Sequence, residues 1–316
     1  MNQPVRIEVN EVGPRDGLQI EKQIVDTDAK VAFVDALSLC GFRRIEVTSF
    51  TSPKAIPALA DAQDVMQRIR RVPGVIYTAL VPNVRGLERA MESGTDEMNL
   101  VMSASETHNR ANLRMTRQQS LAELLAILQR ADGAGVPCNV SLSTAFGCPF
   151  EGDVAADDVM SLAHRLVDAG ACGVTLCDTT GMAYPTQVAA LSERAQRELP
   201  QAAITLHLHN TRGMALANAL AGWQTGITRF DAAAGGLGGC PFAPGASGNV
   251  NTEELVHMFE SMSVDTGVSL DALMPVVTGL PKLIARPFSI PLASAGQRLH
   301  THPAPAWLAE RFPAGV

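Results

Sequence analysis

The chain repeats one structural unit along most of its length: an amphipathic helical stretch ends, and a β-rich run follows within a few residues. Five of these junctions carry a glycine, at Gly41, Gly94, Gly135, Gly170 and Gly226. Glycine is favoured just past a helix end, where the backbone needs a positive φ. Two further junctions carry Pro73 and Pro200, and proline also stops a helix. The repeat therefore predicts alternating helices and strands.

Together with an opening β-rich run, the junctions predict eight strands, near residues 6–12, 43–48, 75–81, 97–102, 138–143, 173–177, 203–208 and 229–233. Such alternation implies parallel strands joined by right-handed crossovers. Eight units predict an α/β fold of the TIM (β/α)8 barrel type. We expect the catalytic barrel domain over residues 1–265 and a short C-terminal helical extension and tail over 266–316. A doubly wound open sheet is the alternative, but it usually has fewer strands.

Composition narrows the class of protein and its partners. The 316 residues are 46% hydrophobic with a net charge of only −7, which is typical of a globular chain and not of a disordered one. The acidic charge balance argues against nucleic acid as a partner, because binding to phosphates needs a basic stripe. The sequence contains no run of 18 apolar residues, so we expect no membrane helix. The N-terminus also lacks the apolar core of a signal peptide. Six scattered cysteines without CxxC pairs favour free thiols, and we expect a cytoplasmic protein.

Polar side chains gather where the predicted strands end. In a barrel of parallel strands these ends share one rim, and that rim carries the chemistry. The first strand ends near Arg15 and Asp16, the second carries Glu46, the sixth ends at Asp178, and the seventh ends in a His-Leu-His sequence. We expect these groups to converge at the barrel mouth.

The histidine pair is the sharpest of these features. Residues i and i+2 of a strand point to the same face, so His207 and His209 can both reach one ion while Leu208 faces away. Asp16 supplies an oxygen ligand from another strand end. Nitrogen donors favour Mn²⁺, Co²⁺ or Zn²⁺, and cytosolic abundance favours Mg²⁺. The alternative is a pair of histidines whose hydrogen bonds are satisfied at a polar barrel mouth.

A glycine-rich run with one thiol follows the eighth strand. It reads GGLGGCPFAPGASGN over residues 235–249 and contains Cys240. It matches neither phosphate-binding glycine motif, so a mobile lid over the site is the functional interpretation. A thiol near a metal can act as an acid or base. A plain linker into the helix near 250–262 is the alternative.

Six motifs in the same order resemble the 3-hydroxy-3-methylglutaryl-CoA lyase family of metal-dependent barrel enzymes: EVGPRDGLQ, EVTSFTSPK, GCPFEG, DTTG, HLHN and the glycine-rich run with Cys240. The resemblance implies a carbon–carbon lyase that cleaves 3-hydroxy-3-methylglutaryl-CoA to acetyl-CoA and acetoacetate by metal-assisted retro-Claisen cleavage. It implies an acyl-CoA thioester as the small-molecule substrate and a Mg²⁺ or Mn²⁺ cofactor. It also suggests a homodimer or higher homo-oligomer, and a place in leucine degradation or ketone-body metabolism.

Site residues follow from the same motifs. The resemblance implies the metal ligands Asp16, His207, His209 and Asn249. It implies that Arg15 stabilises the thioester enolate, that Cys240 takes part in proton transfer, that Glu46 supports the first-strand site and that Asp178 lies in the reaction pocket. In a retro-Claisen cleavage the C3 hydroxyl loses a proton to an imidazole or carboxylate while negative charge develops on the thioester oxygen, so the chemistry needs these residue types.

Some positions differ from the family pattern and keep other activities open. Ile20 stands where the family usually has Asn, and Asn210 stands where it often has Asp. The segment after the fourth strand, which we expect to be a long loop that includes His108, also differs. A related substrate such as citramalyl-CoA or an isoprenoid-extended glutaryl-CoA is therefore an alternative.

Two other activities compete with the lyase. A Claisen condensing synthase would share the metal site, but such enzymes usually carry a further C-terminal domain and lack the glycine–cysteine loop. A catalytically inactive metal-binding barrel is disfavoured because Arg15, Asp16, His207, His209, Cys240 and Asn249 are all intact.

Overall fold

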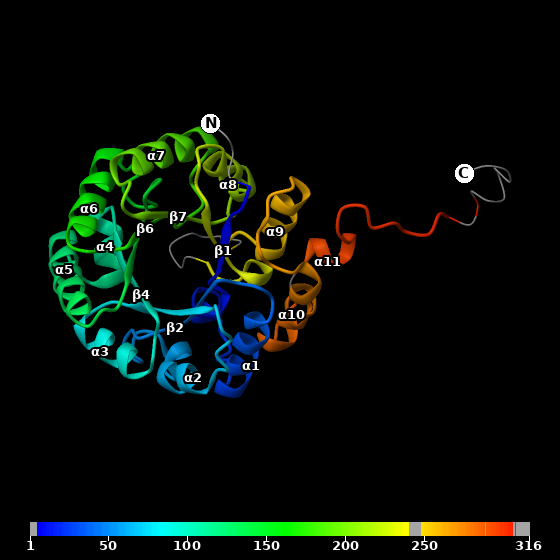
Figure 1. The fold of residues 1–316 in the computed structure, drawn as a ribbon, viewed down its shortest axis with the longest axis horizontal. Helices are drawn as coiled ribbons and strands as arrows, with labels where there is room; N and C mark the ends of the chain where they lie inside the picture. The colour runs from blue at the N-terminus through cyan, green and yellow to red at the C-terminus, as the bar shows by residue number, and fades with distance from the viewer. Residues whose placement is uncertain (1–4, 240–247, 288, 306, 308–316) are drawn as a thin grey trace.

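Eight parallel strands close into a barrel in the order β1 to β8 (Figure 1). The computed structural model describes residues 5–239, 248–287, 289–305 and 307. The strands are β1 Glu8–Glu11, β2 Arg44–Ser49, β3 Ile76–Val81, β4 Glu97–Ser103, β5 Cys138–Ser143, β6 Gly173–Asp178, β7 Ala203–Leu208 and β8 Arg229–Ala232. Pairing of β1 with β8, with Glu8 opposite Arg229, closes the barrel. The predicted TIM barrel is confirmed.

Helices surround the strands as an outer ring (Figure 1). They are α1 Thr27–Ser38, α2 Ala62–Arg68, α3 Val84–Glu92, α4 Glu106–Leu113, α5 Arg117–Gly133, α6 Ala156–Asp168, α7 Pro185–Glu198, α8 Ala215–Gln224, α9 Thr252–Ser261, α10 Leu270–Leu283 and α11 Pro291–Ala295. Short turns η1 Gly13–Gly17, η2 Leu18–Ile20, η3 Pro57–Leu59 and η4 Ala234–Gly236 follow some strand ends. The prediction of a loop after β4 is wrong, because residues Glu106–Leu113 form helix α4. Ser105 caps this helix by accepting a hydrogen bond from the His108 amide.

The junction glycines behave as their position after each helix predicts. All five have positive φ, from 68° at Gly135 to 104° at Gly170. Gly41 is required for a second reason, since a Cβ there would lie 2.2 Å from the carbonyl oxygen of Gly267. The chain past α1 therefore packs directly against the segment that precedes α10.

The strands separate an apolar layer from a polar lumen. On β4, Met98, Leu100 and Met102 are fully buried, whereas the alternate residues Glu97 and Asn99 line a small polar cavity inside the barrel. This alternation follows from the two-residue period of a strand. The hydrophobic core thus lies between sheet and helices, and the interior of the barrel is free to carry charged and amide groups beneath the mouth.

The C-terminal helices lie on the outside of the barrel. α10 contacts α1 and α9 and buries Leu273, Val277 and Leu280. Among the described residues, no helix combines the length and apolar character needed to cross a bilayer.

Candidate active site at the barrel mouth

The first part of the site is η1, a wide helical turn that directly follows β1. The amides of Arg15 and Asp16 both donate to the Val12 carbonyl, at 3.2 and 2.7 Å. Both side chains are buried at this turn. Wide turns of this kind are rare and frequent at functional sites. The turn places a guanidinium and a carboxylate side by side at the mouth, as the sequence predicts.

The two histidines at the end of β7 face the same point. The Nε2 atoms of His207 and His209 lie 3.1 Å apart, and an Asp16 carboxylate oxygen lies 4.0 Å from Nε2 of His207. One donor atom from each of the three residues lies within 4.8 Å of the other two, and all three residues are buried. Leu208 is buried in the apolar core. The structure therefore brings together the three side chains that the sequence assigns to one ion.

Asn249 reaches this cluster because residues 248–250 lie against the end of β7. The Val250 amide donates to the Leu208 carbonyl, and His209 pairs with Asn249 in an isolated antiparallel bridge. Gly238 has φ 93°, and a Cβ there would lie 2.7 Å from the Asn249 amide nitrogen and 3.0 Å from Asp16. A residue without a side chain is needed for this close approach.

The side-chain atoms of Asp16, His207, His209 and Asn249 that face this point are suited to bind a divalent cation. Asn249 Nδ2 donates to Asp16 Oδ2 at 2.6 Å, while its buried Oδ1 has no hydrogen-bond partner among the described residues. A buried acceptor without a donor is unfavourable unless another group satisfies it. Two imidazole nitrogens, one carboxylate and this amide oxygen are ligands that Mn²⁺ and related ions accept.

The protonation states of these residues suit ligation. Burial opposes the charge on Asp16, but Arg15 and the two histidines outweigh it and lower the pKa of Asp16 to about 2. Burial, together with the neighbouring His207, lowers the pKa of His209 to about 3. Near neutral pH the carboxylate is therefore ionised and the His209 ring is neutral, which are the forms that bind a cation.

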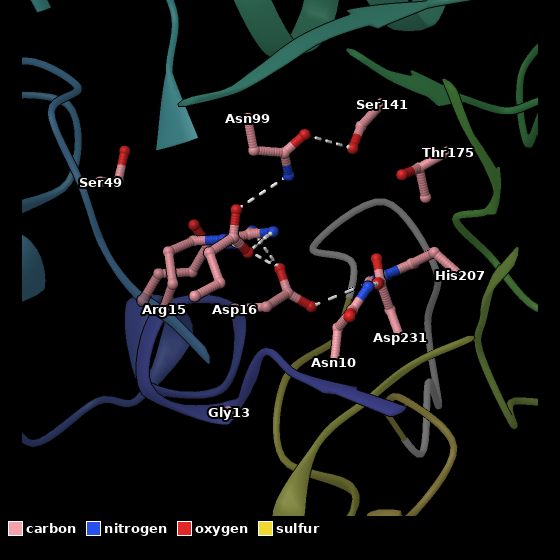
Figure 2. A network of polar contacts seen from close by, with 12 residues as sticks. Asn10, Gly13, Arg15, Asp16, Ser49, Asn99, Ser141, Thr175, His207 and Asp231 are labelled. Atoms are coloured by element: carbon pink, nitrogen blue, oxygen red, sulfur yellow. Dashed lines mark hydrogen bonds and ion pairs between the residues drawn. The ribbon is translucent and has the colours of Figure 1, made fainter. Parts of the chain in front are cut away.

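Arg15 is held between two carboxylates (Figure 2). Its Nε donates to Glu46 Oε2 at 2.6 Å, and its NH1 donates to Asp16 Oδ1 at 2.5 Å. Burial disfavours the charge, but Glu46 and Asp16 overcome it and hold the pKa of Arg15 above its usual range. The guanidinium is therefore permanently charged and fixed in orientation beside the histidines.

Asp178 lies at the end of β6, but its carboxylate faces the turn into α7. It accepts hydrogen bonds from the amides of Met182 at 2.7 Å and Ala183 at 3.1 Å. Burial raises its pKa to about 6. Neighbouring Cys177 and Thr179 line the mouth cavity, whereas Asp178 does not. The structure shows that the Asp178 carboxylate supports the β6–α7 turn, and that its charge interacts with His207. Cys240 lies outside the described residues.

A cavity of about 400 Å³ opens above these groups. Polar and apolar residues both line it: Arg15, Asp16, Gln19, Ile20, Thr51, Ala55, Ile56, Pro57, Leu80, Pro82, Val101, His108, Asn112, Leu113, Ser141, Ser143, Cys177, Thr179, His207, His209 and Gly239. His108 was expected in an open loop, but it is buried on α4 with Nδ1 2.7 Å from Ser103 Oγ. Burial lowers its pKa to about 4.

The lumen beneath the mouth holds residues that the sequence motifs did not indicate. Asp231 on β8 lies 3.2 Å from Nδ1 of His207 and accepts a hydrogen bond from Asn10. Only the alternation of each strand marks such residues as inward-facing, and alternation does not tell which inward side chains touch.

Comparison with known proteins agrees with this geometry. Residues 6–278 match the family model described as HMGL-like. A hydroxymethylglutaryl-CoA lyase of Bacillus subtilis is 46% identical over 91% of this chain and 96% of its own length. An (R)-citramalyl-CoA lyase of Chloroflexus aurantiacus is 41% identical over 92% of this chain and 95% of its own.

Solved structures give the same result. An HMG-CoA lyase of Acinetobacter baumannii, in complex with coenzyme A and 3-methylmalate, has a TM-score of 0.91 and 47% identity over 95% of this chain and 98% of its own. With a family model that spans most of the chain, relatives that align nearly end to end and a barrel that superposes on theirs, this chain belongs to the HMGL-like family.

Proposed function

We propose that this protein is a carbon–carbon lyase that cleaves 3-hydroxy-3-methylglutaryl-CoA to acetyl-CoA and acetoacetate. One observation carries the proposal: a fixed guanidinium lies beside a carboxylate and two imidazoles at the floor of one cavity. Retro-Claisen cleavage needs a cation for the forming enolate and polar groups for a tertiary alcohol, and both are available within this cavity. The near full-length likeness to hydroxymethylglutaryl-CoA lyases supports the same substrate.

We assign the cation site to Asp16, His207, His209 and Asn249. When bound, a Mg²⁺ or Mn²⁺ ion lowers the pKa of the substrate hydroxyl and fixes its geometry. The buried donors of the four residues support this assignment, and the orphaned amide oxygen of Asn249 is the strongest sign that a group belongs there.

We assign the remaining steps to residues around this site. Arg15 stabilises the negative charge on the thioester oxygen, and Glu46 holds Arg15 in place. Asp16 or His207 takes the hydroxyl proton. Burial lowers the pKa of His207, but its hydrogen bond to Asp231 and the charges of Asp231 and Asp16 outweigh burial and raise that pKa. Cys240, on the glycine-rich run, delivers the proton that converts the acetyl-CoA carbanion to product. Asp178 supports the β6–α7 turn and thereby the wall formed by Thr179.

A second substrate is kept for a specific reason. The chain is almost as similar to a citramalyl-CoA lyase as to the B. subtilis enzyme, and Ile20, in the place of the family's usual Asn, lines the cavity.

We further propose that the protein is cytoplasmic and forms a homodimer or higher homo-oligomer. Light scattering on the purified protein tests the oligomeric state. A place in leucine degradation or ketone-body formation depends on which substrate is preferred.

A substrate panel tests the proposed function. Protein stripped with a chelator and reloaded with Mg²⁺ or Mn²⁺ is incubated with 3-hydroxy-3-methylglutaryl-CoA, citramalyl-CoA and an isoprenoid-extended glutaryl-CoA, and released acetyl-CoA is measured. Fastest release from the first ester, with acetoacetate as co-product, supports the proposal. Absence of acetyl-CoA from every ester, with consumption of acetyl-CoA in the presence of a 2-oxo acid, identifies a condensing synthase instead.

A further inference from the structure

Asn99 lies in the polar lumen directly beneath the mouth, on the inward face of β4 (Figure 2). Its Nδ2 donates a 2.8 Å hydrogen bond to Oε1 of Glu46. The other oxygen of that carboxylate, Oε2, is the one that accepts from Arg15. Each oxygen of Glu46 therefore has its own donor, and the amide and the guanidinium together fix the plane of the carboxylate.

The orientation of the Asn99 amide is itself determined by two neighbours on β5. Its Oδ1 accepts from Ser141 Oγ at 2.9 Å and from Asn139 Nδ2 at 3.0 Å. With its oxygen occupied by two donors, the amide cannot turn over without losing both bonds, so its NH2 group must face Glu46. Asn139 is held in turn by Thr175 on β6 at 2.9 Å. A chain of hydrogen bonds thus runs across four strands and ends on Arg15.

We propose that Asn99 is a positioning residue for catalysis, acting through Glu46 to hold the Arg15 guanidinium at the place where negative charge develops. The proposal rests on the proposed lyase function, because it is the forming enolate that needs the fixed cation. A buried carboxylate whose second oxygen lost its donor would be free to rotate or to take up a proton. Either change would weaken the hydrogen bond between Glu46 and Arg15 or let the guanidinium move. A guanidinium that is displaced from the forming enolate stabilises the transition state poorly.

The key variant is Asn99→Asp, which keeps an oxygen toward Ser141 and Asn139 but replaces the amide donor facing Glu46 with a second oxygen. We expect kcat to fall about tenfold, the effect of losing one hydrogen bond to a charged group, with KM changed less than about twofold. Thr205→Val is the matched control, because it removes a hydroxyl from the wall of the same lumen on β7, outside the chain of hydrogen bonds that orients Asn99. It should leave kcat within about twofold of wild type.

A double-mutant cycle separates positioning from general damage to the fold. If Asn99 acts through Glu46, Asn99→Leu should lower kcat strongly in the wild-type background and only slightly in a Glu46→Gln background. An equal effect in both backgrounds, or a Thr205→Val variant as impaired as Asn99→Asp, would overturn the proposal.

An NMR measurement made without substrate tests the positioning role of Asn99 independently of the proposed lyase activity. In protein labelled with ¹⁵N-arginine, the Nε–H resonance of Arg15, assigned by its loss in Arg15→Lys, reports the hydrogen bond to Glu46. It should move clearly in Asn99→Asp and remain in place in Thr205→Val. An unmoved resonance in Asn99→Asp contradicts the positioning role whatever the enzyme cleaves, whereas a moved resonance in a protein that releases no acetyl-CoA refutes only the lyase assignment.

Discussion

The Nε2 atoms of His207 and His209 lie 3.1 Å apart at the end of β7, buried beside the Asp16 carboxylate. On the other side of the His207 ring, Nδ1 lies 3.2 Å from Asp231. An ionised carboxylate only accepts hydrogen bonds, so Nδ1 carries the hydrogen and the Nε2 lone pair faces the cluster. The tautomer of His207 is thus set from the barrel lumen.

Asp231→Asn should therefore weaken cation binding without removing a ligand. The amide can present its NH2 group to His207, which favours the wrong tautomer. Loss of such a supporting contact typically lowers metal affinity about tenfold or more. Calorimetric titration of the stripped protein with Mn²⁺ measures the change. Unaltered affinity in Asp231→Asn would show that the contact does not control the histidine.

Arg15→Met should lower kcat far more than it raises KM. The negative charge that Arg15 meets forms mainly in the transition state, and losing one such donor costs about 3 kcal/mol, or roughly a hundredfold in rate. Arg197→Met serves as the control, because Arg197 lies on the outer surface with a side chain 68% exposed. A change confined to KM would assign Arg15 to ground-state binding instead.

Cys240→Ser should depress turnover while Mn²⁺ affinity stays close to that of wild type, because a hydroxyl is a far weaker acid than a thiol. Cys172→Ser is the matched control, since Cys172 is an exposed free thiol. Steady-state rates and calorimetric titrations on both variants make the comparison. Full activity in Cys240→Ser would exclude the thiol from the mechanism.

Glu11 should make stability depend on pH. Its carboxylate is buried and accepts from the amides of Gly13 and Ala234 and from Thr252, and burial raises its pKa from 4.5 to about 7. A group with a raised pKa stabilises the fold below its unfolded pKa, and this contribution is lost as the pH rises through the folded pKa.

Replacement by glutamine should remove that dependence. The free energy of unfolding of Glu11→Gln minus that of wild type should increase by about 3 kcal/mol between pH 4.5 and pH 8, since each pKa unit corresponds to about 1.4 kcal/mol. Urea unfolding at several pH values measures it. Parallel curves for the two proteins would mean that Glu11 titrates alike in the folded and unfolded states.

The sequence predicts the barrel well because its signals are local. Positive φ at glycines such as Gly41 and Gly170 follows from the helix ends they terminate, and the strands fall within two residues of the predicted ranges. The convergence of Asp16, His207 and His209 could be predicted because parallel strands share one rim.

Other features depend on contacts between distant segments and could not be predicted in this way. Helix α4 escapes sequence prediction because most of its residues are polar and it lacks an apolar stripe, although Ser105 caps its start. The sequence places Asp178 at the end of β6, but it does not show that two amides of the following turn donate to its carboxylate. The contacts of Asn99 and Asp231 join residues on different strands, and no single-strand pattern specifies such pairs.

One divalent cation, held by Asp16, His207, His209 and Asn249, should be required for bond cleavage. The most direct test is titration of chelator-stripped protein with Mn²⁺ while acetyl-CoA release from 3-hydroxy-3-methylglutaryl-CoA is followed. We predict activity that rises with added Mn²⁺ and levels off near one ion per chain, with His207→Ala impaired in both binding and turnover. His164→Ala, a control on α6 paired with Glu198, should match wild type. Full turnover in stripped protein, or a His207→Ala variant as active as wild type, would show that cleavage does not need this cation.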